Sequence, residues 1–500
     1  MDGKLSQKFS EHKGNRQGHV RASGHYKAYI NPCLNSLSDS QLGFNIGPIC
    51  VTSVCIADDS YILSGSQSGL QAALDIVSHY SRRYKVVYNG DKTKLVVTGS
   101  PIDRRYYEDT TPWTLNGERI KVVENNDHLG LIVSGQHEEQ KNIDQNIQNC
   151  RNSLFALLGP AYAFNCQLSP AVQVHLWKTY NLPILCSGLS ALPIRPSQMK
   201  SISIFQRKVL RSFLKLSNRS PIPSMFFLLG ELPLEAQIHI NTLMLFYNAW
   251  SNRSTTVHDL VKYILKMCNQ NSTTWSNHVQ LLCQKYNLPS PLKLLEHETP
   301  WSKDTWKCLV KTTITAYYEN KLRAESKSNS KMNFLNVQLC SLSGLPHPTL
   351  QNIVTTQDAR KLRHHLKFLT GDFLTNERRA IDHHGADPSC SLCSSPLEST
   401  EHVLVSCGAT VETRQRLLPE LLNTVAQVQQ NCAILTNPPD NVLTQFILDC
   451  TSFNLADQYR ISVQNPGISM IYKISRDWTY EVSTVRTRLL KKKKQSAKTT

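Results

Sequence analysis

The chain lacks an apolar run long enough to cross a membrane. A transmembrane helix needs about 20 consecutive apolar residues, and no run in the 500-residue sequence approaches that length. The segment 1–8 also lacks the apolar core of a secretory signal. We therefore expect a soluble, intracellular protein, nuclear or cytoplasmic and not secreted.

Acidic residues are few relative to basic ones. The 38 Asp and Glu face 55 Lys and Arg, which gives a formal net charge of +17. The segment 486–500 carries +7 and no acid, so +10 remains on the rest of the chain. This excess indicates a polyanionic partner, with nucleic acid first and an acidic membrane surface second. We expect 486–500 to be a disordered basic tail, suited to phosphate binding or nuclear import.

The cysteines do not suggest a disulfide framework. Most of the fifteen are scattered singly in apolar stretches, which is typical of buried free thiols in a protein without a secretory route. One cluster, near residue 400, is different and is considered below.

A pair of adjacent acids marks the most informative segment. In 51–64, a β-branched apolar run ends in Asp58 and Asp59, and a second apolar run follows at once. This pattern predicts a strand–turn–strand hairpin with both aspartates at its tip. Paired carboxylates suit Mg²⁺, which binds through one or two carboxylates together with substrate phosphates. The alternative is a solvated turn, because Asp is a common turn residue.

The flanking segments predict further helices and strands. Apolar spacing predicts a helix over 24–37 and an amphipathic helix over 66–84, capped by Ser66 or Ser68. Strands are expected over 85–88 and 94–98, joined by the turn 89–91. The order helix, acidic hairpin, helix, hairpin indicates an α+β fold with an antiparallel sheet.

These segments resemble the reverse transcriptase of non-LTR (LINE-type) retrotransposons. Four motifs occur in the family's order. They are Arg16-Gln17-Gly18 for its RQG segment, Ala57-Asp58-Asp59 for its ADD box, Asn89 with Lys92-Thr93-Lys94 for its N..KTK segment, and His128-Leu129-Gly130 for its YLG strand. The resemblance implies the palm of an RNA-directed DNA polymerase, a nucleotidyltransferase that uses two Mg²⁺ ions and a primer–template of RNA and DNA.

The resemblance also implies roles for individual residues. Asp58 would bind Mg²⁺ directly, and Asp59 would help to hold the site. Arg16 and Gln17 would contact the nucleotide or template, and Gly18 would allow a close backbone approach. Lys92 would neutralise the leaving pyrophosphate, with Lys94 as an equally placed rival and a solvated turn as the alternative for both.

One carboxylate that the family requires has no counterpart. The family's third metal-binding acid lies on an earlier palm strand, but Asp2 and Glu11 stand in a polar segment without such a strand. The fingers are also expected to be absent, and Ala22 follows the RQG segment where the family has proline. A site short of one carboxylate should bind Mg²⁺ weakly or not at all. We therefore expect a truncated, catalytically inactive chain.

The middle of the chain is predicted to be helical. Helices are expected over 138–158, ended by Gly159-Pro160, over 170–180, ended by Asn181-Leu182-Pro183, and over 200–216. The last has a basic outer face, which suits primer–template phosphates or is an ordinary solvated face. By resemblance, these helices belong to the polymerase thumb and connector.

Cys390, Cys393, His402 and Cys407 follow the spacing C-x2-C-x8-H-x4-C. Four such ligands suit tetrahedral Zn²⁺ and leave no position for water, which predicts a structural site. His383 or His384 could replace one ligand. LINE-type reverse transcriptases often carry a zinc knuckle in this region. The preceding basic residues favour nucleic acid as a partner, and they are Lys361, Arg363, His364, His365, Lys367, Arg378 and Arg379.

The patterns and the family resemblance together imply six regions. They are a truncated palm over 1–135, a thumb-like region over 136–235, a helical connector over 236–355, a basic segment with the zinc knuckle over 356–430, a helical region over 431–485 and the basic tail over 486–500. Three hypotheses remain: a fragment of a reverse transcriptase, a non-catalytic zinc-knuckle protein that binds RNA or DNA, and a decayed reading frame. A primer–template of RNA and DNA is the expected partner, and a membrane is not.

Overall fold

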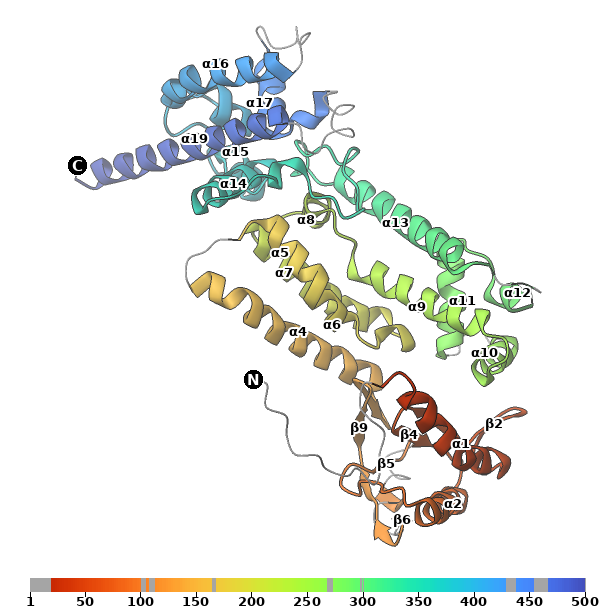
Figure 1. Ribbon diagram of the computed structural model, residues 1–500. Coiled ribbons are helices and arrows are strands. Elements are labelled where there is room, and N and C mark those ends of the chain that lie inside the picture. Colours follow the sequence, from red (N-terminus) through yellow and green to blue (C-terminus); the bar gives the residue numbers. More distant parts are fainter. Residues whose placement is uncertain are drawn as a thin grey trace, which may run out of the picture. The chain divides into compact units, whose positions relative to one another are not determined.

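The computed structural model describes residues 19–99, 105–107, 113–163, 168–267, 273–296, 299, 301–428, 438–453 and 466–499. Helices dominate, and small two-stranded sheets accompany them, which fits the broad α+β class (Figure 1). The chain divides into two compact units. The first unit is 1–141, 248–280 and 291–300, and the second unit is 142–247, 281–290 and 301–500. Within the described ranges, no helix has the length and hydropathy to span a membrane.

Two packed helices form the core of the first unit. They are α1 (Ala22–Asp39) and α2 (Gln67–Tyr84). Ile30 and Leu37 of α1 and Leu74 of α2 are buried in one cluster with Leu95 and Trp113. Both helices lie where apolar spacing predicts them. Ser66 caps α2, because its side chain accepts a hydrogen bond from the backbone N–H of Gly69.

The strands of the first unit form five separate pairs among the described residues. Four pairs are antiparallel: β1 (Phe44–Ile46) with β2 (Ile49–Val51), β3 (Ser53–Ile56) with β4 (Asp59–Ile62), β6 (Thr114–Leu115) with β7 (Glu118–Arg119), and β9 (Asn125–His128) with β10 (Leu131–Ser134). The fifth pair is parallel and joins β5 (Lys94–Val96) to β8 (Lys121–Val123). Helices α10 (Thr256–Met267) and α12 (Pro291–Glu296) also belong to this unit.

The expected hairpin over 85–98 is wrong. Lys85 ends α2 in the left-handed conformation, with φ of 56°. The chain then stays against the helix, because the backbone N–H of Val86 donates to Ser81 O and the Ser81 hydroxyl donates to Val86 O. The segment 85–88 therefore forms no strand, and β5 pairs with a strand more distant in sequence instead.

The second unit begins with a run of helices. These are α4 (Glu138–Ala163), α5 (Pro170–Leu176), α6 (Leu182–Cys186), α7 (Pro196–Leu214), α8 (Ile222–Leu229), α9 (Leu234–Ser251), α11 (Trp275–Lys285) and α13 (Lys303–Lys327), of which α4, α9 and α11 begin or end in the first unit. Two expected helix ends are wrong. Helix α4 continues through Pro160, and a π turn, Trp177–Asn181, connects α5 directly to α6. Pro183 stands in the first turn of α6, directly after this π turn.

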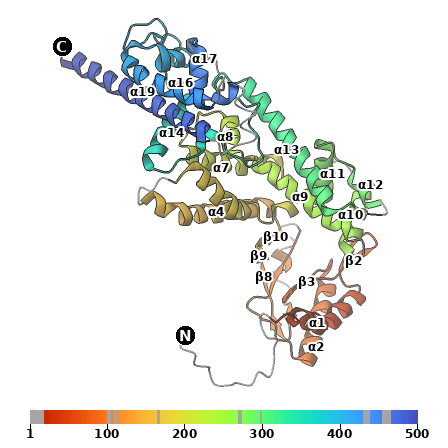
Figure 2. The same cartoon turned by 45° about the horizontal axis from the view of Figure 1, so that its top comes forward.

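The C-terminal part of the second unit is built around one long helix, α19 (Pro466–Thr499). Helices α14 (Thr356–Leu369) and α16 (Val411–Val428) pack along it, as Figure 1 and Figure 2 both show. Two shorter helices, α15 (Asn376–Asp382) and α17 (Asp440–Leu448), complete this part. Trp478 of α19 is fully buried, and its indole N–H donates to Leu404 O over 3.0 Å.

The basic segment 486–500 differs from the expected disordered tail. Helix α19 continues through it to Thr499. Lysine and arginine are good helix formers, and Arg486 is buried against the rest of the unit. The start of the expected tail is therefore part of the packed structure.

Candidate metal centre

Two short backbone turns hold the four predicted zinc ligands. Around Cys390 and Cys393, the N–H of Ser394 donates to Cys390 O over 3.0 Å, and the N–H of Cys390 donates to Ser395 O over 2.8 Å. Ser394 adopts a positive φ of 60°, which closes this turn. His402 begins a single π turn, His402–Ser406, and Cys407 follows it, with the N–H of Cys407 donating to His402 O.

The four ligand atoms form a compact cluster. All lie within 4.8 Å of one another. Cys407 Sγ is 4.0 Å from Cys390 Sγ and 3.8 Å from Cys393 Sγ, and Cys393 Sγ is 3.3 Å from His402 Nε2. A tetrahedral zinc with Zn–S bonds of about 2.3 Å separates its sulfur ligands by roughly 3.8 Å. The cluster therefore matches the size of a tetrahedral zinc site, and it can bind a structural zinc.

Alternative ligands are not required. His383 and His384 are exposed at the end of α15 and lie outside the cluster. In the described part of the chain, no other group of three or more His, Cys, Asp or Glu side chains is placed to hold a metal.

Burial and hydrogen bonding separate the pKa values of the ligands. Burial raises the pKa of the Cys407 thiol to about 12 and lowers the pKa of His402. At Cys393 burial also favours the thiol, but hydrogen bonds from the backbone of Ser395, from neighbouring thiols and from the backbone of Gly408 lower its pKa overall. The imidazole is thus kept neutral, as a metal ligand must be, while zinc would have to displace the proton of Cys407.

A buried ion pair between Glu398 and Arg486 lies next to Cys390. Glu398 has no exposed surface, and its carboxylate accepts two hydrogen bonds from Arg486 of α19 and one from the backbone N–H of Asn376. Cys390 Sγ lies 3.8 Å from Glu398 Oε1. At another of the four ligands, Arg414 Nη1 donates to Cys407 O over 2.6 Å. Sequence reasoning did not identify Glu398, Arg414 or the pairing of Arg486, because their partners are distant in sequence or are backbone atoms.

The acidic hairpin forms as expected. In the β3–β4 pair, Ile56 faces Asp59, so Ala57 and Asp58 form the turn, and Ala57 has a φ of 55°. Asp58 and Asp59 are both exposed. Next to the hairpin, the ring of Tyr61 contacts the ring of His128 with centroids 4.1 Å apart. The ADD-like and YLG-like segments therefore meet in the first unit.

Lys92, the third predicted catalytic residue, is not brought to the aspartates. Lys92 is exposed in a turn, where its backbone N–H donates to Asn89 O and Oδ1, and no contact joins it to Asp58 or Asp59. Arg16, Gln17 and Gly18, together with Asp2 and Glu11, lie outside the described residues. Within the described ranges, no third metal-binding side chain joins Asp58 and Asp59. Nothing in this geometry supports a Mg²⁺ site.

Several basic residues before the cysteines serve packing. Lys361 forms an ion pair with Asp477 of α19 at 2.6 Å, His364 Nδ1 is 2.7 Å from Ser483 Oγ, and His365 is fully buried. Arg378 pairs with Asp382 within α15. These contacts attach α14 to α19 and stabilise α15, so part of the positive charge is not available to a ligand.

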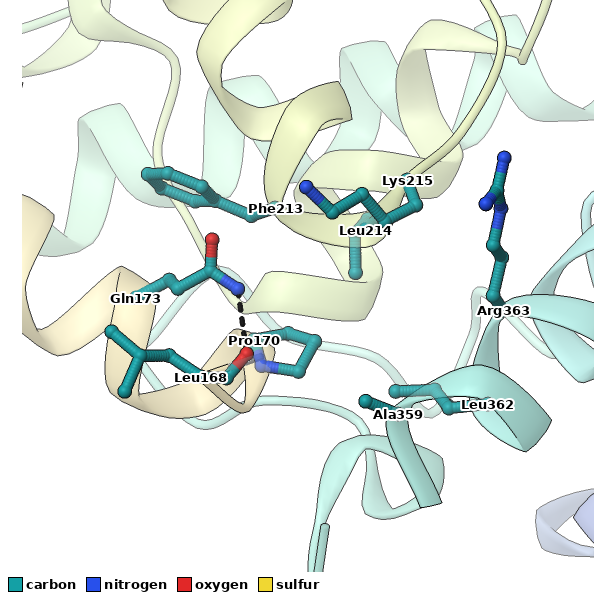
Figure 3. A pocket seen from close by; sticks show the side chains of 9 residues that line it. All are labelled: Leu168, Pro170, Gln173, Phe213, Leu214, Lys215, Ala359, Leu362 and Arg363. Atoms are coloured by element: carbon teal, nitrogen blue, oxygen red, sulfur yellow. Dashed lines mark hydrogen bonds between the residues drawn. The ribbon is translucent and has the colours of Figure 1, made fainter. Parts of the chain in front are cut away.

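Other cations lie where α7 ends beside α14. Lys215, Arg360 and Arg363 are exposed there, and Lys367 is partly exposed; we name these four residues the α7–α14 surface. Figure 3 shows Lys215 and Arg363 among the side chains that line a cavity of about 20 Å³ between the two helices. Burial, and then the charge of Arg363, lower the pKa of Lys367. A bound anion would relieve the repulsion between Arg363 and Lys367, which nearby Asp372 partly offsets.

Comparison with known proteins adds no assignment: no family model matches the sequence, and no curated protein matches it.

Proposed function

We propose that the chain is the C-terminal portion of a non-LTR retrotransposon reverse transcriptase, that it binds RNA or DNA, and that it does not polymerise by itself. The observation that carries the binding role is the Cys390–Cys393–His402–Cys407 cluster within the basic second unit. The order of the four sequence motifs supports the ancestry.

Zinc at this cluster would have a structural role. The protein supplies all four ligands, so no coordination position is left for water or substrate. When bound, the ion would cross-link the Cys390–Cys393 turn to the His402–Cys407 turn. The residues then present a fixed surface, and they do not perform a reaction.

The charge distribution favours nucleic acid as the partner. The net charge is +17, and exposed cations occur on the α7–α14 surface and at the end of α19. Contacts of Lys and Arg with backbone phosphates release counterions, so affinity should fall steeply with salt. This type of contact carries little sequence information, so we expect binding to a range of RNA and DNA sequences.

Binding at several salt concentrations tests this role. Fluorescence anisotropy of labelled RNA and DNA oligonucleotides should give an affinity that falls with salt, with a log–log slope that the double substitution Lys215→Ala and Arg363→Ala reduces by about 2. Lys311→Ala removes an exposed charge on α13, outside the α7–α14 surface, and should leave the slope nearly unchanged. An affinity that does not respond to salt would refute phosphate binding.

Primer extension tests the absence of polymerase activity. Asp58 and Asp59 are exposed at a hairpin tip without a third acid among the described residues, and a two-metal reaction needs carboxylates that hold both ions. We expect no nucleotide incorporation by the purified chain with Mg²⁺. Incorporation that Asp58→Asn abolishes would show that the chain is an active polymerase.

A further inference from the structure

The end of α19 leaves the packed body of the second unit. Up to Arg486, one side of the helix is buried through Trp478 and Val482. Beyond it, Leu489 and Leu490 are half-buried, and every residue from Lys491 to Ser496 is exposed. Lys491 to Lys494 are four consecutive lysines, and Lys491 and Lys494, three residues apart on the helix surface, repel each other. An exposed helix end of this kind is marginal unless other contacts hold it.

The metal centre supplies such contacts. Lys493 Nζ donates to Ser391 O over 2.7 Å, and Ser391 lies between the ligands Cys390 and Cys393. Earlier on the same helix, Arg486 binds both oxygens of Glu398, whose carboxylate lies 3.8 Å from Cys390 Sγ. Two points on the basic helix are therefore attached to the part of the chain that folds around Cys390.

We propose that zinc at Cys390, Cys393, His402 and Cys407 holds the basic end of α19 in its docked helical form, with Lys493 as the tether, and so assembles a phosphate-binding surface from Arg488, Lys491, Lys492 and Lys494. The nucleic-acid partner in this inference rests on the proposed function. The proposed dependence of the helix on zinc does not rest on the proposed function, because it is argued only from the contacts of Arg486 and Lys493 with the segment around Cys390.

The physical basis is the loss of the Cys390 turn when the metal leaves. Without zinc, the turn 390–395 is held by two backbone hydrogen bonds, and two thiols come close to each other in a buried space beside Glu398. A small metal site of this type contributes its binding energy directly to local folding. When the turn opens, Ser391 O moves away from Lys493, and repulsion among the lysines favours unwinding.

Hydrogen exchange of the full chain tests the dependence on zinc. In the zinc-loaded protein, amides over 487–496 should be protected, and removal of zinc with a chelator should increase their exchange at least about tenfold. Cys390→Ser should give the same increase with zinc present. Cys308→Ser, at an exposed cysteine of α13 outside the cluster, should not.

Two single lysine substitutions test the docking of α19 and leave the metal ligands intact. Lys493→Ala should increase exchange over 487–496 in the zinc-loaded protein, whereas Lys491→Ala removes the same charge from an exposed position and should not. Unchanged exchange after zinc removal, or equal exchange in the two lysine variants, would overturn the proposal.

Measurement of RNA and DNA affinity separates the zinc dependence of the helix end from the identity of its partner. If exchange depends on zinc but the zinc-loaded wild-type chain does not bind RNA or DNA, the partner is wrong and the proposed function fails with it. If the wild-type chain binds with the same affinity after the helix end has unwound, the assembled surface is wrong while the proposed function stands.

Discussion

Arg486 binds Glu398 through two hydrogen bonds, from Nε to Oε1 over 3.0 Å and from Nη2 to Oε2 over 2.8 Å, although 88 residues separate them. Glu398 is fully buried, and Arg486 is nearly so. The guanidinium also lies over the ring of Phe373, with its Cζ 5.5 Å from the centroid. This pair therefore attaches the Cys–His segment to α19 next to the metal centre.

Glu398→Gln should strongly destabilise the second unit. It leaves the buried Arg486 without a counter-charge, a change that costs about 3 kcal/mol or more when a buried pair loses one partner. Urea denaturation followed by tryptophan fluorescence measures the loss. Glu481→Gln breaks the exposed pair with Arg416 and should cost less than about 1 kcal/mol. Equal costs for the two variants would contradict the role of the Glu398–Arg486 pair.

Asp449 is a second buried acid, and it should make the second unit sensitive to low pH. Burial alone would raise its pKa, but the nearby His347 and hydrogen bonds from Thr451 and Asn336 lower that pKa to about 2. A carboxyl with a depressed folded pKa stabilises the fold above its unfolded pKa of about 4 and loses this effect as pH falls towards 2.

Asp449→Asn tests this linkage. The variant should be less stable than wild type at pH 7, and the difference in free energy of unfolding should shrink by about 2 kcal/mol between pH 5 and pH 2. Urea midpoints for both proteins across this range provide the measurement. The hydroxyl of Tyr472, which donates to Asp449 Oδ1 over 3.1 Å, keeps its proton throughout. A difference that is the same at every pH would exclude Asp449 as the titrating group.

Glu231 should show the opposite pH dependence. Its burial outweighs the ion pair with Lys178 and raises its pKa to about 7. A raised pKa means that the fold favours the protonated acid, so its contribution to stability is greatest below about pH 4.5 and falls as pH rises to 7.

Glu231→Gln should therefore gain stability relative to wild type as pH rises from 4.5 to 7, by up to about 3 kcal/mol. Glu235→Gln is the matched control, because the pKa of Glu235 is lowered overall: burial opposes its charge, but Lys285 stabilises it. That variant should change little relative to wild type between pH 4.5 and 7, because the stabilisation that a lowered pKa provides is lost only below about pH 4.5. Parallel profiles for the two variants would contradict the assignment.

The sequence was sufficient where a local pattern determines the structure. The helix 66–84 has its apolar residues on one face and a serine at its start, and both determine α2 with little help from the rest of the chain. The zinc cluster was predicted for a similar reason, since few spacings bring four ligands together. The acidic hairpin also follows from its alternating pattern and tight turn.

Local sequence patterns did not predict structure that depends on contacts between segments distant in sequence. The parallel pairing of β5 with β8 depends on residues about 27 positions apart, so the local turn at 89–91 misled the prediction of a hairpin. The basic segment after 486 has the composition of a disordered tail, but its helix contacts Glu398 and Ser391, far away in sequence, through Arg486 and Lys493. Lys361 and His364 were expected to favour nucleic-acid binding, but their side chains contact Asp477 and Ser483 of α19 instead.

Zinc titration of the metal-free chain, with a labelled RNA oligonucleotide as reporter, tests the central claim most directly. If the Cys–His cluster organises a nucleic-acid-binding unit, RNA affinity should rise until one zinc is bound per chain and then stay constant, and Cys393→Ser should abolish the rise. RNA affinity that is the same with and without zinc, or an equal response from Cys393→Ser, would contradict the claim.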